Sequence, residues 1–190
     1  GAIFGLVSSL LAVWTGDGSG YQIAQTQPMK LAAVEGLYEG GTNVGLVGIG
    51  MLNPEKKTYN DGKDPFLFRI EIPSMLSFLA ERDVDGYVPG ITNIIEGGYQ
   101  LKDGTTALSA AEKIERGKTA IGALAAYRAA KSAGHEEDAA VAYQVLQENM
   151  PYFGYGYIKD VNQLVPNVPL NFYAFRIMVI LGGYFILFFI

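Results

Sequence analysis

Apolar residues are concentrated at the two ends of the chain, and the long stretch between them alternates short apolar runs with polar turns. Residues 1–15 carry an uncharged run that ends near Trp14 and covers about 21 Å of a hydrocarbon core about 30 Å thick. Residues 169–190 are also apolar, with Arg176 as their one charge. The pattern predicts the C-terminal part of one membrane helix and the N-terminal part of the next. We therefore expect a fragment of a longer membrane protein; a signal-peptide apolar region is the alternative for the first run.

Residues 16–168, between the two apolar ends, are numerous enough for one compact domain. The segment opens with GDGSG, whose glycines predict a sharp exit from the first helix between Gly16 and Gly20. Pro28 suits the first turn of a new helix, and strong helix formers follow it. We expect a short helix over 28–38, ended by the glycines at 40 and 41.

Extended structure is expected next. Residues 41–50 are apolar and glycine-rich, which fits a strand or irregular structure. After a polar turn, FLFRIEI at 66–72 alternates apolar and charged residues and predicts a short strand. Ser74 would then cap a helix over 75–81.

The alanine-rich stretch 106–147 predicts a helical hairpin. Ser109 and Glu112 fit a capping box, and Gly134 with His135 separates a second helix over 136–148. The predicted fold class is therefore mainly α: two truncated transmembrane helices joined by a long, largely helical loop domain.

Charge and composition exclude several classes of function. The chain has 14 Lys and Arg against 19 Asp and Glu, a net charge of −5, which argues against a nucleic-acid surface. It has no cysteine, so disulfides, thiolate metal sites and covalent CxxCH haem attachment are excluded. The single histidine, His135, lies in the polar run SAGHEED, where a surface residue is expected rather than a haem ligand.

Lys30 and Glu35 are the first candidate chemistry. Five residues apart, they lie roughly 140° from each other around a helix, which is not the geometry of an intrahelical ion pair. A hydrogen-bond-donating cation and a carboxylate could flank a ligand that has two polar oxygens and loses protons. On spacing alone, two ordinary surface residues are the commoner explanation.

Met178 is the second candidate. Its thioether is of the soft kind that serves as an axial haem ligand. Ala174 and Gly182 lie one turn before and after it, so this face of the helix has only small side chains beside Met178. Helix packing with methionine as a core filler is the alternative. Arg176, about 200° away around the helix, would reach either a haem propionate or a partner carboxylate.

Four sequence blocks resemble blocks of one known family and follow one another in the same order as in that family. They are GDGSGY with the following QP and KLAAVEGLYE, FRIEIPSMLSFLAERDVDG at 68–86, FGYGYI at 153–158, and VPLNFYAFRIMV at 168–179. This set is similar to the quinol-binding loop, or Q-loop, of cytochrome bd-type quinol oxidase subunit I, with parts of its two flanking helices. Residues 91–150 carry little that identifies the family.

The resemblance implies a set of site residues. Lys30 would hold a quinol oxygen and Glu35 would accept or relay a proton, with Asp17, Tyr21 and Gln27 as weaker candidates for the same pocket. Met178 would be one axial ligand of the low-spin haem b, with Arg176 its neighbour in the motif. The other b and d haems would have their ligands outside this stretch.

The resemblance also implies partners and a location. The chain would act as a quinol:O2 oxidoreductase only within the full-length multi-haem complex, reducing O2 to water and contributing to the proton gradient. Its partners would be a membrane quinol (ubiquinol or menaquinol), subunit II of the oxidase and the lipid bilayer.

The chain would lie in the bacterial cytoplasmic membrane as part of a multi-pass protein. The loop, 16–168, would be on the extracytoplasmic side, and the FRIEIP block would lie near the quinol. The aromatic cluster at 150–157 would line the quinone path or mark the bilayer boundary. The alternative hypothesis is a non-enzymatic extracytoplasmic sensor between two membrane helices. A third hypothesis is a structural loop of a transporter.

Overall fold

The computed structural model describes residues 1–190 and is mainly helical, with one two-stranded sheet. It divides into two compact units, unit 1 with residues 1–94 and 165–190, and unit 2 with residues 95–164. The elements in chain order are α1 (Ala2–Thr26), α2 (Pro28–Glu35), β1 (Leu46–Leu52), β2 (Phe66–Ile72), α3 (Met75–Glu81), α4 (Ile91–Glu96), α5 (Ala110–Ala133), α6 (Glu136–Asn149), the 3-10 helices η1 (Met150–Tyr157) and η2 (Val161–Leu164), and α7 (Val168–Phe189).

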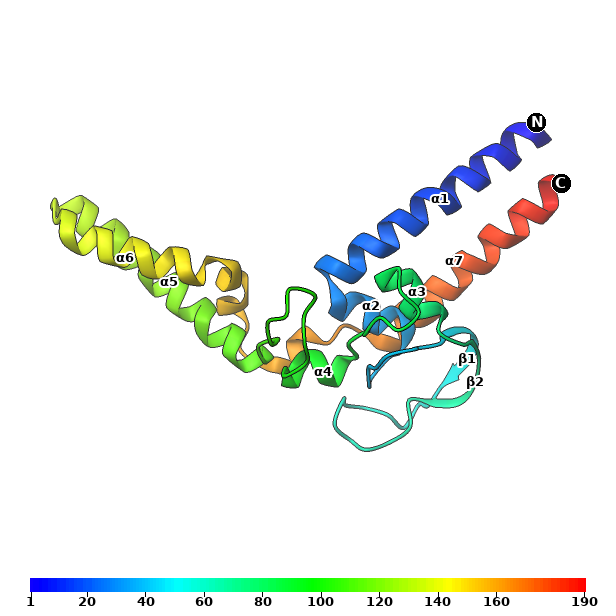
Figure 1. The fold of residues 1–190 in the computed structure, drawn as a ribbon, viewed down its shortest axis with the longest axis horizontal. Coiled ribbons are helices and arrows are strands. Elements are labelled where there is room, and N and C mark those ends of the chain that lie inside the picture. The colour runs from blue at the N-terminus through cyan, green and yellow to red at the C-terminus, as the bar shows by residue number, and fades with distance from the viewer. The chain divides into compact units, whose positions relative to one another are not determined.

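The helices α1 and α7 are the two long apolar elements of unit 1. They run side by side, with the start of α1 beside the end of α7 (Figure 1). The Phe189 ring lies so close to Gly5 that a side chain at Gly5 would clash with it. By length and composition, the helical segments 2–26 and 161–189 are each apolar enough to cross a membrane. The two apolar helices expected at the ends of the chain are therefore present.

The predicted turn between Gly16 and Gly20 is wrong, because α1 continues through it to Thr26. The Thr15 and Ser19 hydroxyls donate to the carbonyls of Leu11 and Thr15 one turn earlier, which is compatible with an unbroken helix. Glycine costs a helix only about 1 kcal/mol per residue, and contacts between α1 and α3 can offset that. Local composition was a poor guide to this boundary.

The helix α2 begins as predicted at Pro28 but ends at Glu35, before the predicted end at Tyr38. Gly36 adopts the left-handed conformation (φ 62°), and its N–H donates to the carbonyls of the last turn. A Cβ at Gly36 would also press on the side chains of Leu52, Phe66 and Phe172. The helix therefore ends before Gly40 and Gly41, the two glycines predicted to end it.

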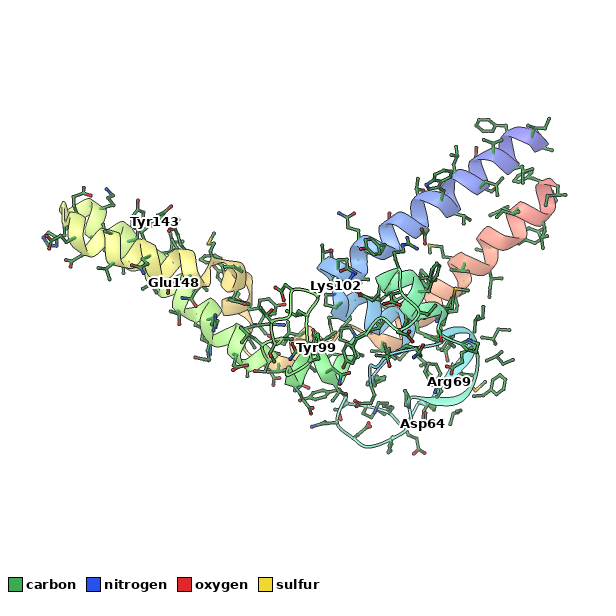
Figure 2. The ribbon with its side chains drawn as sticks, in the orientation of Figure 1. Asp64, Arg69, Tyr99, Lys102, Tyr143 and Glu148 are labelled. Carbon is green, nitrogen blue, oxygen red and sulfur yellow. The ribbon has the colours of Figure 1, made fainter.

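The strands β1 and β2 form an antiparallel hairpin, which confirms the predicted strand at 66–72. Phe66 and Phe172 pack edge to face with their ring centroids 5.6 Å apart, and Phe172 is fully buried. Asp64, in the loop before β2, and Arg69, in β2, are both exposed (Figure 2). The start of α7 thus supplies part of the core of unit 1.

The helix α3 covers the predicted residues, 75–81, but Ser74 does not cap it with its side chain. Ser74 has φ 56°, whereas a capping serine needs an extended backbone to direct its hydroxyl at the first turn. The buried Ser77 instead accepts a hydrogen bond from the N–H of Val44 at 2.9 Å. The start of α3 is therefore tied to the segment that precedes β1.

Unit 2 is the predicted helical hairpin with η1 packed against it. The capping box of Ser109 and Glu112 is confirmed, and Gly134 ends α5 in the left-handed conformation. Phe153 of η1 packs on the core formed by Ala120, Ala123 and Leu146. At least one aromatic ring of the 150–157 cluster therefore has a core role; α6 carries Tyr143 and Glu148 on its surface (Figure 2).

Candidate functional site: two ion pairs and an exposed methionine

A buried ion pair joins Glu35, at the end of α2, to Arg176 of α7. Arg176 Nη2 donates to Glu35 Oε2 at 2.6 Å, and Nη1 lies 3.3 Å from Oε1. The Glu35 side chain is 3% exposed and that of Arg176 10%. Of the two partners predicted for Arg176, a carboxylate is the one that the structure shows.

The Arg176 guanidinium also binds two backbone carbonyls of the loop. Nη1 donates to the carbonyl of Val34 at 2.7 Å, and Nη2 donates to that of Val47 in β1 at 2.8 Å. The Phe172 ring lies against it, with 4.2 Å from Cζ to the ring centroid. A planar group with five donors fits this set of acceptors, whereas a lysine would not. Arg176 thus fixes both α2 and β1 to α7.

Small residues let α2 approach closely enough for this pair to form. Ala32 and Ala33 are fully buried, and Glu35 follows them into the interior. Burial raises the pKa of Glu35 above the usual value for a glutamate, and the hydrogen bond and charge of Arg176 oppose that rise. The carboxyl is therefore held in place while its proton affinity is increased.

Lys30 lies on the exposed side of α2, so the structure separates it from the buried Glu35. Their difference in exposure agrees with the spacing of five residues, which turns the two side chains to different sides of a helix. Gln27 is exposed as well, and its backbone carbonyl accepts from the N–H of Lys30 at 2.9 Å.

Asp17 and Tyr21 meet at a second arginine, Arg82. Arg82 Nη2 donates to Asp17 Oδ2 at 2.6 Å and Nη1 to Oδ1 at 3.1 Å. The Arg82 Cζ lies 5.1 Å from the centroid of the Tyr21 ring. Arg82 is not among the site residues predicted from the sequence, although it lies in AERD at 80–83, within the 68–86 block.

Met178 projects from α7 with 58% of its surface exposed. Ala174, one turn earlier, is exposed, and a Cβ added at Gly182, one turn later, would meet open space. This face has room for a flat macrocycle, so these residues fit one side of a haem with a thioether ligand. No group of three His, Cys, Asp or Glu side chains forms a metal site within the chain.

Two further candidates from the sequence have ordinary surroundings. His135 is exposed, as expected for a surface residue, with Nδ1 3.6 Å from Asp138 Oδ2. In the FRIEIP block, Phe68 and Ile70 are exposed and paired with Met51 and Ile49 across the hairpin.

Comparison with known proteins identifies the chain's relatives. The family model of cytochrome bd terminal oxidase subunit I matches residues 1–190. The chain is similar to cytochrome bd-II ubiquinol oxidase subunit 1 of Escherichia coli (strain K12), with 29% identity over 201 residues that cover 98% of this chain and 35% of that protein. The chain thus spans about a third of the length of this curated relative.

Proposed function

The chain belongs to the family of cytochrome bd terminal oxidase subunit I, and on this premise we propose that it forms the quinol-oxidising loop and two flanking helix segments of a quinol:O2 oxidoreductase. The observation that carries the proposal is the buried pair of Glu35 and Arg176. It ties the loop helix with the predicted quinol ligands to the helix with the predicted haem ligand, Met178. The alternative of a non-enzymatic sensor is not favoured by this family membership.

Lys30 and Glu35 have different tasks in this proposal. The exposed ammonium of Lys30 donates a hydrogen bond to one quinol oxygen, which orients the ring. Glu35 takes up a quinol proton, and the pKa of this carboxyl, which burial raises above the usual glutamate value, favours its holding that proton. Arg176 positions the Glu35 carboxyl. Asp17, Tyr21 and Gln27 complete the binding surface.

Met178 would hold a haem b through its thioether sulfur, and when bound the haem would supply a one-electron acceptor for quinol oxidation. The open surface at Gly182 leaves space beside the thioether. Arg176, two residues before Met178, is occupied by Glu35 and two loop carbonyls. The helix α7 therefore carries both the predicted haem ligand, Met178, and Arg176, which positions Glu35.

We assign the wider setting from the family. α1 and α7 lie in the bacterial cytoplasmic membrane, and residues 16–168 lie mostly on the extracytoplasmic side, with the part of α1 beyond Gly16 close to the interface. The partners are a membrane quinol, the second oxidase subunit and the lipid bilayer, and further b and d haems are bound elsewhere in the full-length protein. Quinol protons are released outside, which contributes to the proton gradient when O2 is reduced to water with cytoplasmic protons.

The test uses the full-length oxidase in membranes and compares oxygen consumption driven by quinol with that driven by an artificial donor that bypasses the loop. For Glu35→Gln we expect quinol-driven kcat to fall by about a hundredfold, the usual contribution of a proton acceptor. For Lys30→Gln we expect a rise in the quinol KM. Activity from the artificial donor and the haem spectrum should remain. If both variants keep wild-type quinol kinetics, quinol is not oxidised at this helix.

A further inference from the structure

One face of α1 is held by the C-terminal end of α3. Asp17, Tyr21 and Gln25 are spaced four residues apart, so they lie in a row on α1. Gln25 Nε2 donates to the carbonyl oxygen of Ala80, in the last turn of α3, at 2.8 Å. Arg82, directly after α3, binds the other two members of the row.

The contact between Arg82 and Asp17 fixes the orientation of the carboxylate as well as its place. Two guanidinium nitrogens donate to two carboxylate oxygens, at 2.6 and 3.1 Å, which restricts rotation of the Asp17 side chain. The same guanidinium lies near the face of the Tyr21 ring, where a cation is attracted by the ring electrons. One side chain therefore orders two residues of the proposed binding surface.

Arg82 has a backbone conformation that is uncommon for a residue other than glycine. Arg82 has φ 58°, the left-handed conformation in which a helix usually ends with glycine. Its N–H still donates to the carbonyl of Phe78 at 2.8 Å, so the helix ending itself does not need the side chain. The guanidinium is therefore available for its contacts with Asp17 and Tyr21, at a position where the backbone alone would favour glycine.

We propose that Arg82 is a positioning residue for quinol binding, which holds Asp17 and Tyr21 in the orientation that contacts the substrate. This inference rests on the proposed function, since it takes Asp17 and Tyr21 to be quinol contacts. Arg82 and Arg176 then have parallel tasks: Arg176 positions the acidic residue at the end of α2, and Arg82 positions the acidic residue on α1.

The test measures quinol kinetics of the full-length oxidase with Arg82→Gly, Arg82→Lys and Asp17→Asn. Glycine suits the left-handed backbone, so Arg82→Gly removes the guanidinium without straining the helix end. We expect it to raise the quinol KM about tenfold, the effect of one lost strong contact. Arg82→Lys should recover part of this, because it keeps the charge but not the two-point contact. Lys131→Gln, which removes an exposed ion pair in unit 2, is the matched control and should leave KM unchanged.

The double variant Arg82→Gly/Asp17→Asn should raise KM by less than the product of the two single effects, because part of the effect of Arg82 acts through Asp17. A raised KM in Asp17→Asn with normal KM in Arg82→Gly would overturn the positioning role and leave the proposed function standing. A normal KM in Asp17→Asn would also overturn it, and the proposed function would then depend on Lys30 and Glu35. Loss of artificial-donor activity or of the haem spectrum in Arg82→Gly would show a structural role instead.

Discussion

At the scale of single residues, Arg176 combines two costly features, a charge within an apolar helix and almost complete burial. Its four hydrogen bonds and the adjacent Phe172 ring replace the water that it would otherwise need. Removing one member of such a pair lowers the stability of the folded protein, since the other charge is left buried without a partner. The pair therefore specifies which face of α2 lies against α7.

Arg176→Met should lower the free energy of unfolding by about 3–5 kcal/mol, because the buried Glu35 loses its partner. The double variant Arg176→Met/Glu35→Leu should recover a large part of that loss, since no buried charge remains. Thermal unfolding of the detergent-solubilised full-length protein, compared for both single variants and the double variant, measures the coupling. A double variant less stable than either single variant would contradict this account.

The raised pKa of Glu35 makes a prediction about pH. A proton acceptor works only when ionised, so quinol-driven kcat/KM should fall as pH drops through the pKa of Glu35. Because burial raises that pKa, the fall should begin at a higher pH than the ordinary glutamate value of 4.5 would give. Activity from the artificial donor, recorded over the same pH range, should not show this fall at low pH. The residual quinol-driven activity of Glu35→Gln should not show it either.

At the scale of elements, local patterns predicted those pieces whose stability is local. The alternation at 66–72, the helical run at 75–81 and the Ser109 capping box are signals carried by neighbouring residues, and each predicted element is present. The predicted turn at Gly16–Gly20 was wrong, because contacts between α1 and α3 outweigh the weak preference of glycine against a helix.

The candidate site was predictable only in part, for the same physical reason. The motif containing Lys30 and Glu35 is continuous in sequence, whereas the partner of Glu35 lies 141 residues away. Spacing on one helix predicted that Lys30 and Glu35 do not pair, but it cannot find an ion pair made by the tertiary fold. Arg82 was missed for this reason too, since it meets Asp17 only through the packing of α3 on α1.

The loop between β1 and β2 depends on Asp61. Its carboxylate accepts hydrogen bonds from Lys56 Nζ at 2.8 Å and from the N–H groups of Lys57, Thr58 and Lys63. These donors, Lys56 first, hold the pKa of Asp61 far below its usual range. The Lys56 side chain is 5% exposed, and its Nζ lies 4.4 Å from the centroid of the Tyr38 ring. Without Asp61 this buried ammonium would lose its anionic partner.

Asp61→Asn should therefore loosen residues 53–65 and expose their lysines to trypsin, which cleaves after lysine. We expect faster cleavage at Lys56, Lys57 and Lys63, measured by mass spectrometry of limited digests. Glu55→Gln, which removes an exposed ion pair with Lys63 in the same loop, is the control and should digest as the wild type does. Because the pKa of Asp61 is lowered, its stabilisation should persist at any pH above its ordinary value of 3.8 and fade only in stronger acid.

At the scale of the whole molecule, the proposed chemistry lies in one of the two units. Every residue assigned to quinol or haem binding belongs to unit 1, which contains 1–94 and 165–190. Unit 2 has its own core and carries none of them. A fault in the packing of unit 2 should then leave the chemistry of unit 1 intact.

Gly117→Ala tests this separation. In α5, a Cβ at Gly117 would lie 2.5 Å from the Tyr152 carbonyl oxygen and would clash with the backbone at Gly156, so α5 and η1 must move apart, at about 1–3 kcal/mol. Gly122→Ala, in the same helix, meets open space and is the matched control. We expect Gly117→Ala alone to speed proteolysis within 110–157, while both variants keep the quinol KM and haem spectrum. A raised quinol KM in Gly117→Ala alone would show that unit 2 takes part in quinol oxidation.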